Sequence, residues 1–565
     1  MANSQCAIVI NKTFRGLMAF WLAVAANPAH ANVSLKNGNF FVGYTDVFYP
    51  GGFEPKIERI YNSKTPFNGM FGHGWGNEYE VYLRVSADGS VVVHEYGGGA
   101  ENRFNPAAYS AAELQKSVDQ ITTFAAKSGF RADNAYKDRL RRDAVFRNDE
   151  WEKYLTKPGR PGLAPRQLAN NTRLFSNRFS YQFITRVPGG YFRSFDSGRT
   201  EKFNEIGKLI RISDKNNNSI DLSYDKDNKL SKIVDNFNRK IFVTINRLGK
   251  VEKIQGENGK EATYKYNEIG ELTSSKDAEG NTYTYKYSMD KLHNMVEIGY
   301  SDKTTLAMSY WGKDKFQNIH TVKDRDGTQT EYTYNFLGAD KLTTNVAVNV
   351  KGADGKVSSK SVYEYVTKLK ADGDEWVAQM SSTVDGEKTE YVYNEFGLPL
   401  VIKKGTDETT FAYDAKGHVT RKTTPTEVTE MAYDPKVGKV TKVVKFPKAD
   451  KHRVSWSEFQ YDGAGNLVTA KNSKHQGVKL IYDSHGRIFS MVDQGHRQIQ
   501  FKYNENSKPV EITDPQLGSI RVEYFNSGEI KKIDSSAGRK IALQVTTAFQ
   551  NLLDIIRPAG VTLAF

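Results

Sequence analysis

The chain alternates short runs, in which every second residue is apolar or aromatic, with polar turns that contain glycine. The stretch YNEIGELTSSKDAEGNTYTYKY, from Tyr266 to Tyr287, holds two such runs and two such turns. Asn or Asp shortly before Gly favours a tight turn, and alternating aromatic residues are typical of a half-buried strand. One such stretch therefore predicts one β-hairpin.

The same pattern recurs along most of the chain. Its aromatic position returns every 21 residues at first, then at longer intervals, and again every 21 residues near the end. These register positions are Phe203, Tyr224, Ile245, Tyr266, Tyr287, Tyr310, Tyr334, Tyr365, Tyr393, Tyr413, Tyr433, Tyr461, Tyr482, Tyr503, Tyr524 and Val545. In the middle, VKGADGKVSSK and KLKADGDEW predict lengthened hairpins. Because a lone hairpin is marginal in water, each must pair with the next, which predicts a mainly β fold, a spiral of antiparallel β-hairpins.

The expected size of this sheet follows from strand geometry. About 32 strands at ~4.8 Å make a ribbon ~150 Å long, and ~7 residues per strand make it ~25 Å wide. Twist and the protection of edges favour winding. Wound once, the ribbon would form a hollow ring ~50 Å across.

A helical insert is predicted over residues 105–174, where the β pattern stops. Ser110 and Glu113 have the spacing of a capping box, and apolar residues follow at helical spacing; they are Leu114, Val118, Ile121 and Ala125. Asp133 is placed to cap a second helix, which Trp151 and Leu155 prolong or follow, and the prolines of KPGRPGLAPR end the run. Three interpretations stay open: a plug in one mouth of the ring, a partner-docking hairpin on its rim, or a small enzymatic domain.

Residues 1–31 have the pattern of a signal peptide. Lys12 and Arg15 precede an apolar run over 16–26, and Ala29 and Ala31 flank His30, so we expect cleavage after Ala31. An uncleaved anchor or a buried helix are the alternatives. No later apolar run approaches ~18 residues, so we expect export to the envelope or the medium of a bacterium, without stable membrane insertion afterwards.

The composition excludes further kinds of reactive site and partner. The one cysteine, Cys6, lies in the signal segment, which leaves no disulfide, thiol nucleophile or thiolate metal site in the mature chain. The formal charge of +13 becomes +11 when Lys12 and Arg15 are removed. The remaining lysines alternate with acids, so we expect no nucleic-acid partner, while attraction to anionic glycans or lipids stays open.

The repeated pattern Tyr-Asp/Asn-x-x-Gly-x-Leu resembles the YD repeats of the Rhs family, which includes bacterial Rhs toxins, wall-associated proteins, the C subunit of insecticidal toxin complexes and animal teneurins. Two further segments, over 32–47 and 57–80, are similar to the module that opens Rhs cores. The matching residues are Tyr61, Asn62, Gly72, Gly74 and Trp75, whereas Val33 follows Asn32 without the family's proline. The resemblance covers 32–104 and 175–545.

This resemblance implies a large hollow spiral, which in toxin relatives encloses a C-terminal effector. The chain departs from that pattern because its repeat array is shorter. It also has Asp514-Pro515 with Gly518, and Asp534 with Gly538, in place of a paired Asp-Pro-x-Gly cleavage signature. Residues 546–565 form a short apolar end, so we expect no toxin domain, and we interpret these aspartates as turn residues rather than as a self-cleavage site.

Several residues are candidates for catalysis or metal binding, but each is also explained by a purely structural role. His73 lies among glycines beside Trp75, as in a packed turn. DKDNK, DRDGTQTE and DGDE lack the ligand order of a calcium loop and suit Asx turns. Glu78 with Glu80, and Asp372, Asp374 and Glu375, are candidate glycosidase carboxylates or simply solvated charges. We therefore predict no catalytic residue, metal or cofactor.

Alternating tyrosines in TYTYKY, TEYTY and TEYVY share one face of their strands. They are core residues if that face points inward, and sugar-stacking residues if it points outward. The sequence thus predicts a noncatalytic, exported binding scaffold for a glycan or a cell-surface protein. The alternatives are a toxin-delivery shell that encloses a polypeptide and an envelope-glycan hydrolase.

Overall fold

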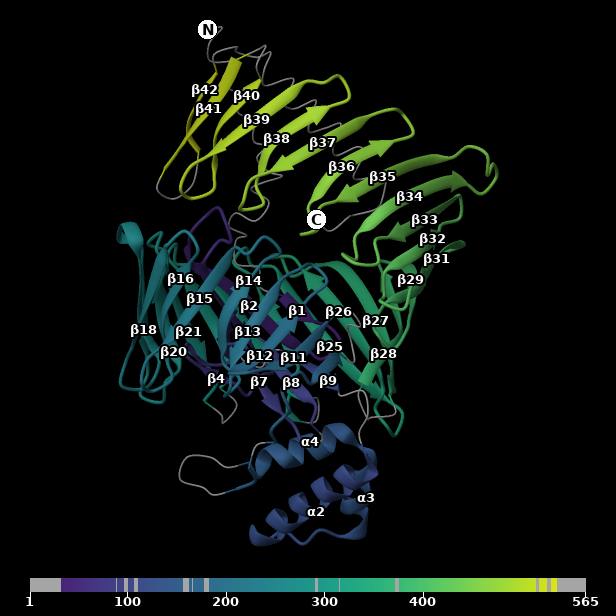
Figure 1. Ribbon diagram of the computed structural model, residues 1–565. Helices are drawn as coiled ribbons and strands as arrows, with labels where there is room; N and C mark the ends of the chain where they lie inside the picture. The colour runs from purple at the N-terminus through teal and green to yellow at the C-terminus, as the bar shows by residue number, and fades with distance from the viewer. Residues whose placement is uncertain are drawn as a thin grey trace.

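The computed structural model describes residues 32–535 except 88, 96–99, 106–109, 156–161, 165, 177–181, 290–292, 314–315, 371–374, 515–517 and 526–529. Within them the chain forms two layers of antiparallel sheet and a group of three α-helices (Figure 1). Strands supply most of the regular structure, so the prediction of a mainly β fold is confirmed.

A small sheet opens the chain. It is built from β1 (Asn32–Ser34), β2 (Asn39–Phe48), β3 (Lys56–Asn62) and β6 (Trp75–Asn77), which pair antiparallel in that order. A short pair, β4 (Asn68–Gly69) and β5 (Gly72–His73), lies between β3 and β6. We call residues 32–80 the opening module.

Among the described residues, the large sheet contains 36 strands, each antiparallel to the next. Its first part consists of β7 (Tyr82–Val85), β8 (Val91–Glu95), β9 (Ala100–Asn105), β10 (Arg173–Ser176), β11 (Phe183–Val187), β12 (Gly190–Ser194), β13 (Thr200–Asn204), β14 (Leu209–Ser213), β15 (Ser219–Tyr224), β16 (Leu230–Asp235), β17 (Lys240–Ile245) and β18 (Val251–Gly256). After a 3₁₀ turn, η1 (Glu257–Gly259), it continues with β19 (Glu261–Tyr266), β20 (Leu272–Lys276), β21 (Thr282–Tyr287), β22 (Met295–Tyr300), β23 (Thr305–Tyr310), β24 (Ile319–Lys323), β25 (Gln329–Leu337), β26 (Thr343–Lys351), β27 (Val357–Leu369) and β28 (Glu375–Val384).

The remaining strands are β29 (Glu387–Tyr393), β30 (Pro399–Lys404), β31 (Asp407–Tyr413), β32 (Val419–Thr423), β33 (Glu427–Tyr433), β34 (Val440–Pro447), β35 (Ser455–Tyr461), β36 (Leu467–Asn472), β37 (Gly477–Tyr482), β38 (Ile488–Asp493), β39 (Gln498–Tyr503), β40 (Pro509–Asp514), β41 (Gly518–Tyr524) and β42 (Ile530–Ser535). The hairpins of β25 to β28 have the longest strands of the sheet, as the two long middle segments predict.

Two local devices make each repeat a hairpin. The register residue ends a strand at a β-bulge, as at Tyr224, and the bulge increases the local twist. The Asp or Asn that follows closes the turn with its side chain, as when Asp225 Oδ1 accepts bonds from the Asp227 and Lys229 amides. The same arrangement recurs at Asp414, Asp462, Asp483 and Asn504. The Asx turn predicted for DKDNK is therefore confirmed, and in DRDGTQTE the Asp326 carboxylate accepts a bond from the Thr328 amide; residues 372–374 of DGDE lie outside the described residues.

The sheet winds past one full turn, which corrects the estimate of a single ring. Asn216, in the β14–β15 turn, exchanges amide hydrogen bonds of 2.8 and 3.3 Å with Asn466, in the β35–β36 turn. These hairpins are 21 strands apart in chain order. Figure 1 accordingly shows β35 to β42 above β14 to β16. The estimate was low because it omitted β7 to β9 and assumed that the ribbon ends would meet in one plane.

The opening module lies inside the first turn of the sheet. In Figure 1 its purple strands lie within the teal ring. Its side chains join those of the large sheet in one buried cluster that runs from Phe40 to Tyr365. The first turn therefore has two layers where the opening module packs against it.

The insert forms α2 (Ala111–Lys127), α3 (Asn134–Arg142) and α4 (Ala144–Lys153). The predicted capping box of Ser110 and Glu113 is present, and Asp133 caps α3. Val118, Ile121, Leu140 and Trp151 form a separate small core. None of the helices in the described part of the chain is long and apolar enough to span a membrane.

Candidate functional site: the inner face of the wound sheet

The register tyrosines act as clamps between neighbouring strands. Tyr482 ends β37 and pairs with Ile488 of β38, while its hydroxyl donates a 2.8 Å bond to the carbonyl of Leu467 on β36. One side chain thus connects three strands. The same bond to a strand-opening carbonyl is made by Tyr224, Tyr310, Tyr413, Tyr433, Tyr461, Tyr503 and Tyr524.

Tyr266 and Tyr287 keep the register but have other surroundings. The Tyr287 hydroxyl accepts a 2.9 Å bond from Trp75 Nε1 of the opening module. Tyr266 lies between the same two layers, and burial raises its pKa above the ordinary range. At these two repeats the tyrosine side chain contacts the opening module instead of bonding to a carbonyl of a neighbouring strand.

Three of the residues that carry the resemblance of the opening module, Tyr61, Gly72 and Trp75, lie at its contact with the large sheet. The Tyr61 hydroxyl accepts a 2.9 Å bond from the Met295 amide. Gly72, with φ of +103°, lies so close to Gly270 that a Cβ would come within 2.9 Å of its carbonyl oxygen. Gly74 likewise leaves room for the Tyr61 ring, and the Asn62 side chain caps the Lys64 amide.

A buried ion pair forms the centre of this contact. Arg59 donates bonds to both oxygens of Asp46 and a 2.7 Å bond to Ser275 Oγ, and the Tyr264 hydroxyl donates to Asp46. Both charged side chains are fully buried. The Arg59 guanidinium lies 4.8 Å from the Trp75 ring and near three tyrosine rings. A buried charge requires such partners, so this group fixes how the two layers meet.

Sequence reasoning missed this centre, although a signal was present. In KIERIYN, Arg59 occupies the same alternate face as Ile57 and Tyr61, which are both buried. A charged residue on the apolar face of a strand needs a buried partner. Asp46 is on the strand that pairs with this one, but Ser275 and Tyr264 come from more than 200 residues away.

The candidate glycosidase carboxylates serve the packing of the opening module. Glu80 accepts bonds from the Met70 amide (2.7 Å) and from Asn77 Nδ2 (2.9 Å), and burial raises its pKa to about 7. Burial likewise raises the pKa of Glu78 to about 7. The Glu80 carboxylate is thus bonded within its own module. Asp372 and Asp374 lie outside the described residues.

His73 is part of a small polar contact between the layers. Its ring lies 5.1 Å from that of His293, whose Nδ1 is 2.7 Å from Glu271 Oε1. Burial lowers the pKa of His73. No group of three potential metal ligands was found within the described ranges.

The alternating tyrosines of β21 point inward, toward the opening module. Tyr283 and Tyr285 contact Tyr44, with ring centroids 4.6 and 6.2 Å apart, and Tyr285 also meets the edge of Trp75 at 5.3 Å. In this run the core interpretation is correct, and the sugar-stacking one is wrong.

The side chains on the inner face are less buried over β29 to β32 than on the strands before and after them. None of their residues is fully buried, and the two buried clusters of the sheet end on either side of them. Five half-buried apolar side chains share this face through direct cross-strand pairs or alternate positions on one strand; they are Tyr391, Tyr393, Ile402, Phe411 and Tyr413. We call them the open inner strip. It lies where the sheet climbs from its lower to its upper turn (Figure 1).

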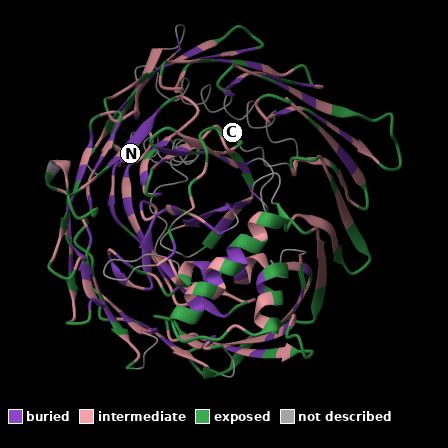
Figure 2. Ribbon diagram, turned by 60° about the horizontal axis from the view of Figure 1, so that its bottom comes forward, coloured by how far each residue is buried: buried purple, intermediate pink, exposed green. Residues whose placement is uncertain are grey.

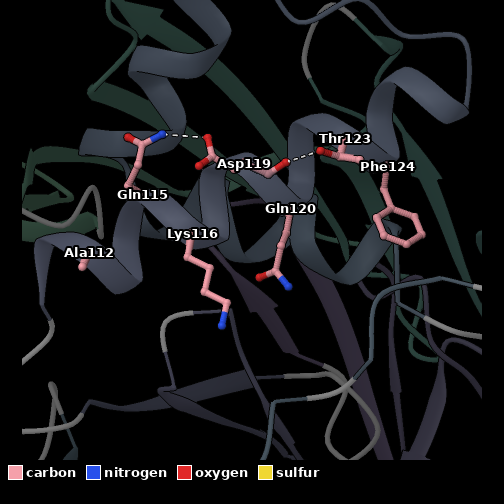
Figure 3. Close-up of a pocket in the computed structure, with 7 residues that line it drawn as sticks. All are labelled: Ala112, Gln115, Lys116, Asp119, Gln120, Thr123 and Phe124. Carbon is pink, nitrogen blue, oxygen red and sulfur yellow. Dashed lines mark hydrogen bonds between the residues drawn. The ribbon is translucent and has the colours of Figure 1, made fainter.

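The helical insert lies at one end of the ring, below β7 to β9 in Figure 1 and in front of the ring in Figure 2. Ser117 Oγ and Arg166 both donate bonds to the Ala87 carbonyl, in the β7–β8 turn. A shallow depression runs along α2 (Figure 3). Two of its polar side chains bond within the helix, Gln115 to Asp119 Oδ1 and Thr123 to the Asp119 carbonyl, and Gln115 also accepts a bond from Arg141 of α3.

Some sequence-based predictions fall outside the described residues. These are the signal segment with Ala31 and Cys6, the register position Val545, Pro515 of the Asp-Pro pair, and the apolar end over 546–565.

Comparison with known protein families gives two matches. Residues 30–104 match a family described as a domain of unknown function, DUF6531, and residues 427–563 match the teneurin YD-shell family. The first match includes the opening module, and the second includes the upper turn of the sheet.

Two curated relatives are nucleases of Bacillus. The tRNA3(Ser)-specific nuclease WapA of Bacillus spizizenii is 28% identical over 202 residues, and the tRNA nuclease WapA of Bacillus subtilis is 26% identical over 200. Each alignment covers 34% of this chain and 8% of the relative. The chain thus spans a small part of the relatives' length.

Solved structures that contain Tc toxin components match most of the chain at low identity. The Tc holotoxin pore of Photorhabdus luminescens matches 90% of this chain and 28% of its own, at 12% identity and a TM-score of 0.42. A TcdB2–TccC3 crystal structure matches 93% and 29%, at 13% identity and a TM-score of 0.43. The repeats, the opening module and the two family matches together make the chain similar to YD-repeat proteins of the Rhs family over residues 30–104 and 427–563.

Proposed function

We propose that this chain is an exported, noncatalytic scaffold that binds a surface ligand, a glycan or a protein, on its wound sheet. The observation that supports this most is the structural use of its polar side chains. The register tyrosines clamp strands, the turn carboxylates close hairpins, and the Asp46–Arg59 pair joins the two layers. The outer face of a long sheet is then the surface left for recognition.

A noncatalytic role agrees with the surroundings of the acid–base candidates. A general acid or base must reach a bound substrate, whereas Glu80 is turned toward the amide of Met70 in its own module. The nuclease activity named for the two Bacillus relatives belongs to proteins of which this chain matches 8%.

The test uses the full chain and polysaccharide extracted from a bacterial envelope. We expect the protein to bind the polymer without shortening it. Size-exclusion chromatography of the polymer, sampled over hours of incubation, measures its length. If the polymer were shortened, and if a folded Glu80→Gln variant no longer shortened it, the protein would instead be a hydrolase.

A second experiment measures the mass of the exported protein. It tests the signal segment, and cleavage after Ala31 is the expected result.

A second candidate function is that of a shell for a polypeptide, and the open inner strip favours it. Phe411 and its four neighbours present half-buried apolar surface on the inner face, and such surface favours contact with another chain. In this case the helical insert would close one end of the shell. A copurifying, protease-protected polypeptide that is lost in Phe411→Asp supports the shell, whereas a homogeneous chain with no such polypeptide contradicts it.

A further inference from the structure

The large sheet has two separate cores, and the stretch between them has none. Every strand from β7 to β28 and from β33 to β41 has at least one buried residue. By contrast, none of the residues 383–427 is buried, and the structure describes all of them. One buried cluster lies before this stretch in the chain and the other lies after it. We call β7 to β28 the first turn and β33 to β42 the upper turn; each packs around a core of its own.

The strands β29 to β32 join the two turns without such a core. Each is paired antiparallel with its neighbours, from β28 on one side to β33 on the other. The backbone ladder holds these strands together, while the side chains of the open inner strip are only half-buried. A paired ribbon with no core against it can change its twist without displacing packed side chains. These strands therefore have the properties of a hinge.

The upper turn also contacts the first turn directly, through residues in the turns of hairpins. Lys215 Nζ donates a 2.8 Å bond to the Gly465 carbonyl, and Asn218 Nδ2 donates a 2.9 Å bond to the His485 carbonyl. Together with the other residues of this contact, we call them the seam. The seam consists of Gly51, Lys215, Asn216, Asn218, Phe237, Gly465, Asn466, His485, Gly486 and Asn506.

The seam fits closely, but most of its contacts are polar. A Cβ at Gly486 would come within 2.0 Å of Asn216 Nδ2, so the two turns are in close contact there. The rings of Phe237 and His485 lie 5.1 Å apart, yet no seam residue belongs to either buried cluster. Hydrogen bonds of this kind are exchanged for bonds to water when a contact opens. The seam therefore contributes much less to stability than either core does.

We propose that the upper turn swings on β29 to β32 as a hinge and that the seam holds it closed. In the closed state the seam is formed, as in this structure. In the open state the seam residues are solvated, while both cores and the backbone ladder between them stay intact. Motions of this kind need only a few elements that absorb the change in backbone angles. The inference goes beyond the proposed function and does not depend on it, because it concerns a motion of the sheet and not the identity of a ligand.

Opening at the seam changes the access to the inner face of the sheet. In Figure 1 the upper turn stands above the first turn, and the sheet climbs from one to the other at the open inner strip. The opening module packs against the inner face of the first turn, and the helical insert lies at its lower end. Separation of the two turns widens the access to the open inner strip from the side. The motion thus sets the size of a ligand that reaches this face.

The experiment measures the distance between two nitroxide labels by double electron–electron resonance, on the full chain with Cys6→Ser. One label pair spans the two turns, at Ser223→Cys on β15 and Lys479→Cys on β37. A control pair lies within the first turn, at Ser223→Cys and Thr244→Cys on β17. All three labelled positions are exposed. For the spanning pair we expect a dominant distance from the closed state and a minor, longer distance from the open state.

Two seam variants are expected to increase the open state. Asn216→Ala with Asn466→Ala removes two hydrogen bonds and should raise the ratio of open to closed molecules about fivefold or more. Gly486→Ala should act in the same direction, because its new Cβ displaces the Asn216 side chain. Gly249→Ala is the matched control: φ is +74° at both glycines, so the backbone strain is equal, but the atom nearest to a Cβ at Gly249 is Lys229 Nζ, at 3.5 Å.

Three results would overturn the inference. The first is a distance between Ser223 and Lys479 that stays single and unchanged in both seam variants. The second is a longer distance that appears equally in Gly249→Ala. The third is a distance between Ser223 and Thr244 that broadens together with the spanning one, since the first turn would then be unfolding. None of these measurements uses a ligand, so failure of the hinge is distinguishable from failure of the scaffold function.

Discussion

At the residue scale, the fold depends on tyrosines and turn carboxylates whose interactions are local in sequence. Tyr503 reaches a carbonyl 15 residues earlier, and Asn504 closes the turn that follows it. Contacts of this range follow from a single repeat, which is why the register and the turns could be predicted. The Arg59 centre could not, because Ser275 and Tyr264 reach it through winding, which no single repeat encodes.

Loss of the tyrosine clamps should weaken the upper turn. Removing the hydroxyls of Tyr461, Tyr482, Tyr503 and Tyr524 by substitution with Phe deletes four hydrogen bonds. At about 0.5–1.5 kcal/mol each, the expected loss is about 2–6 kcal/mol. Faster amide hydrogen exchange over β35 to β42 measures it. Tyr391→Phe is the control, since the described contact of Tyr391 is ring stacking on Tyr393, and equal exchange in both variants would refute the clamps.

The stability of the opening module should depend on pH through Glu78. Burial raises its pKa to about 7, above its ordinary value near 4.5. The neutral form is therefore favoured in the folded state, and its stabilising effect is complete below about pH 4.5 and is lost as the pH rises through 7. Glu78→Gln stays neutral, so its thermal midpoint relative to the unmodified chain should rise from pH 5 to pH 8. A pH-independent difference would show that Glu78 is not desolvated.

At the element scale, the helical insert has a small core and is anchored to β7 and to the β7–β8 turn. Ile121 and Leu140 are fully buried in this core, to which Ala87 of the turn also contributes. The Ala87 carbonyl accepts bonds from Ser117 and Arg166, and Arg84 of β7 donates a 3.0 Å bond to Glu152 of α4. The helix caps were predictable because they are local. Whether the insert plugs a mouth of the ring or lies on its rim could not be predicted, because the residues that anchor it, Arg84 and Ala87, come from an earlier part of the chain.

Substitution inside this small core should destabilise the insert alone. Ile121→Ala removes a fully buried side chain, at a cost of about 2–5 kcal/mol. Hydrogen exchange over 111–153 should accelerate, while β15 to β17 keep their protection. Thr123→Ala, on an exposed position of the same helix, is the matched control. Accelerated exchange throughout the large sheet would mean that the insert and the sheet unfold as one unit.

At the scale of the whole molecule, winding of the sheet determines which of its faces are buried and which are accessible to a ligand. The opening module packs against the inner face of the first turn, and the open inner strip lies between the two buried clusters. The repeat pattern was sufficient to predict hairpins and their pairing. It could not predict the pitch of the spiral, which is set by contacts between turns, such as Asn216 with Asn466.

The most direct test of the account is a cross-link between successive turns of the sheet. Cys6 is replaced by Ser, and cysteines are introduced as Asn216→Cys and Asn466→Cys, whose native side chains lie within 2.8 Å of each other although they are 250 residues apart. A short bismaleimide should join the two positions within one chain, identified by peptide mass spectrometry, and each single-cysteine variant should give a mono-adduct. If the folded double variant gave only mono-adducts at both positions, the sheet would not wind over itself, and the layered scaffold would be contradicted.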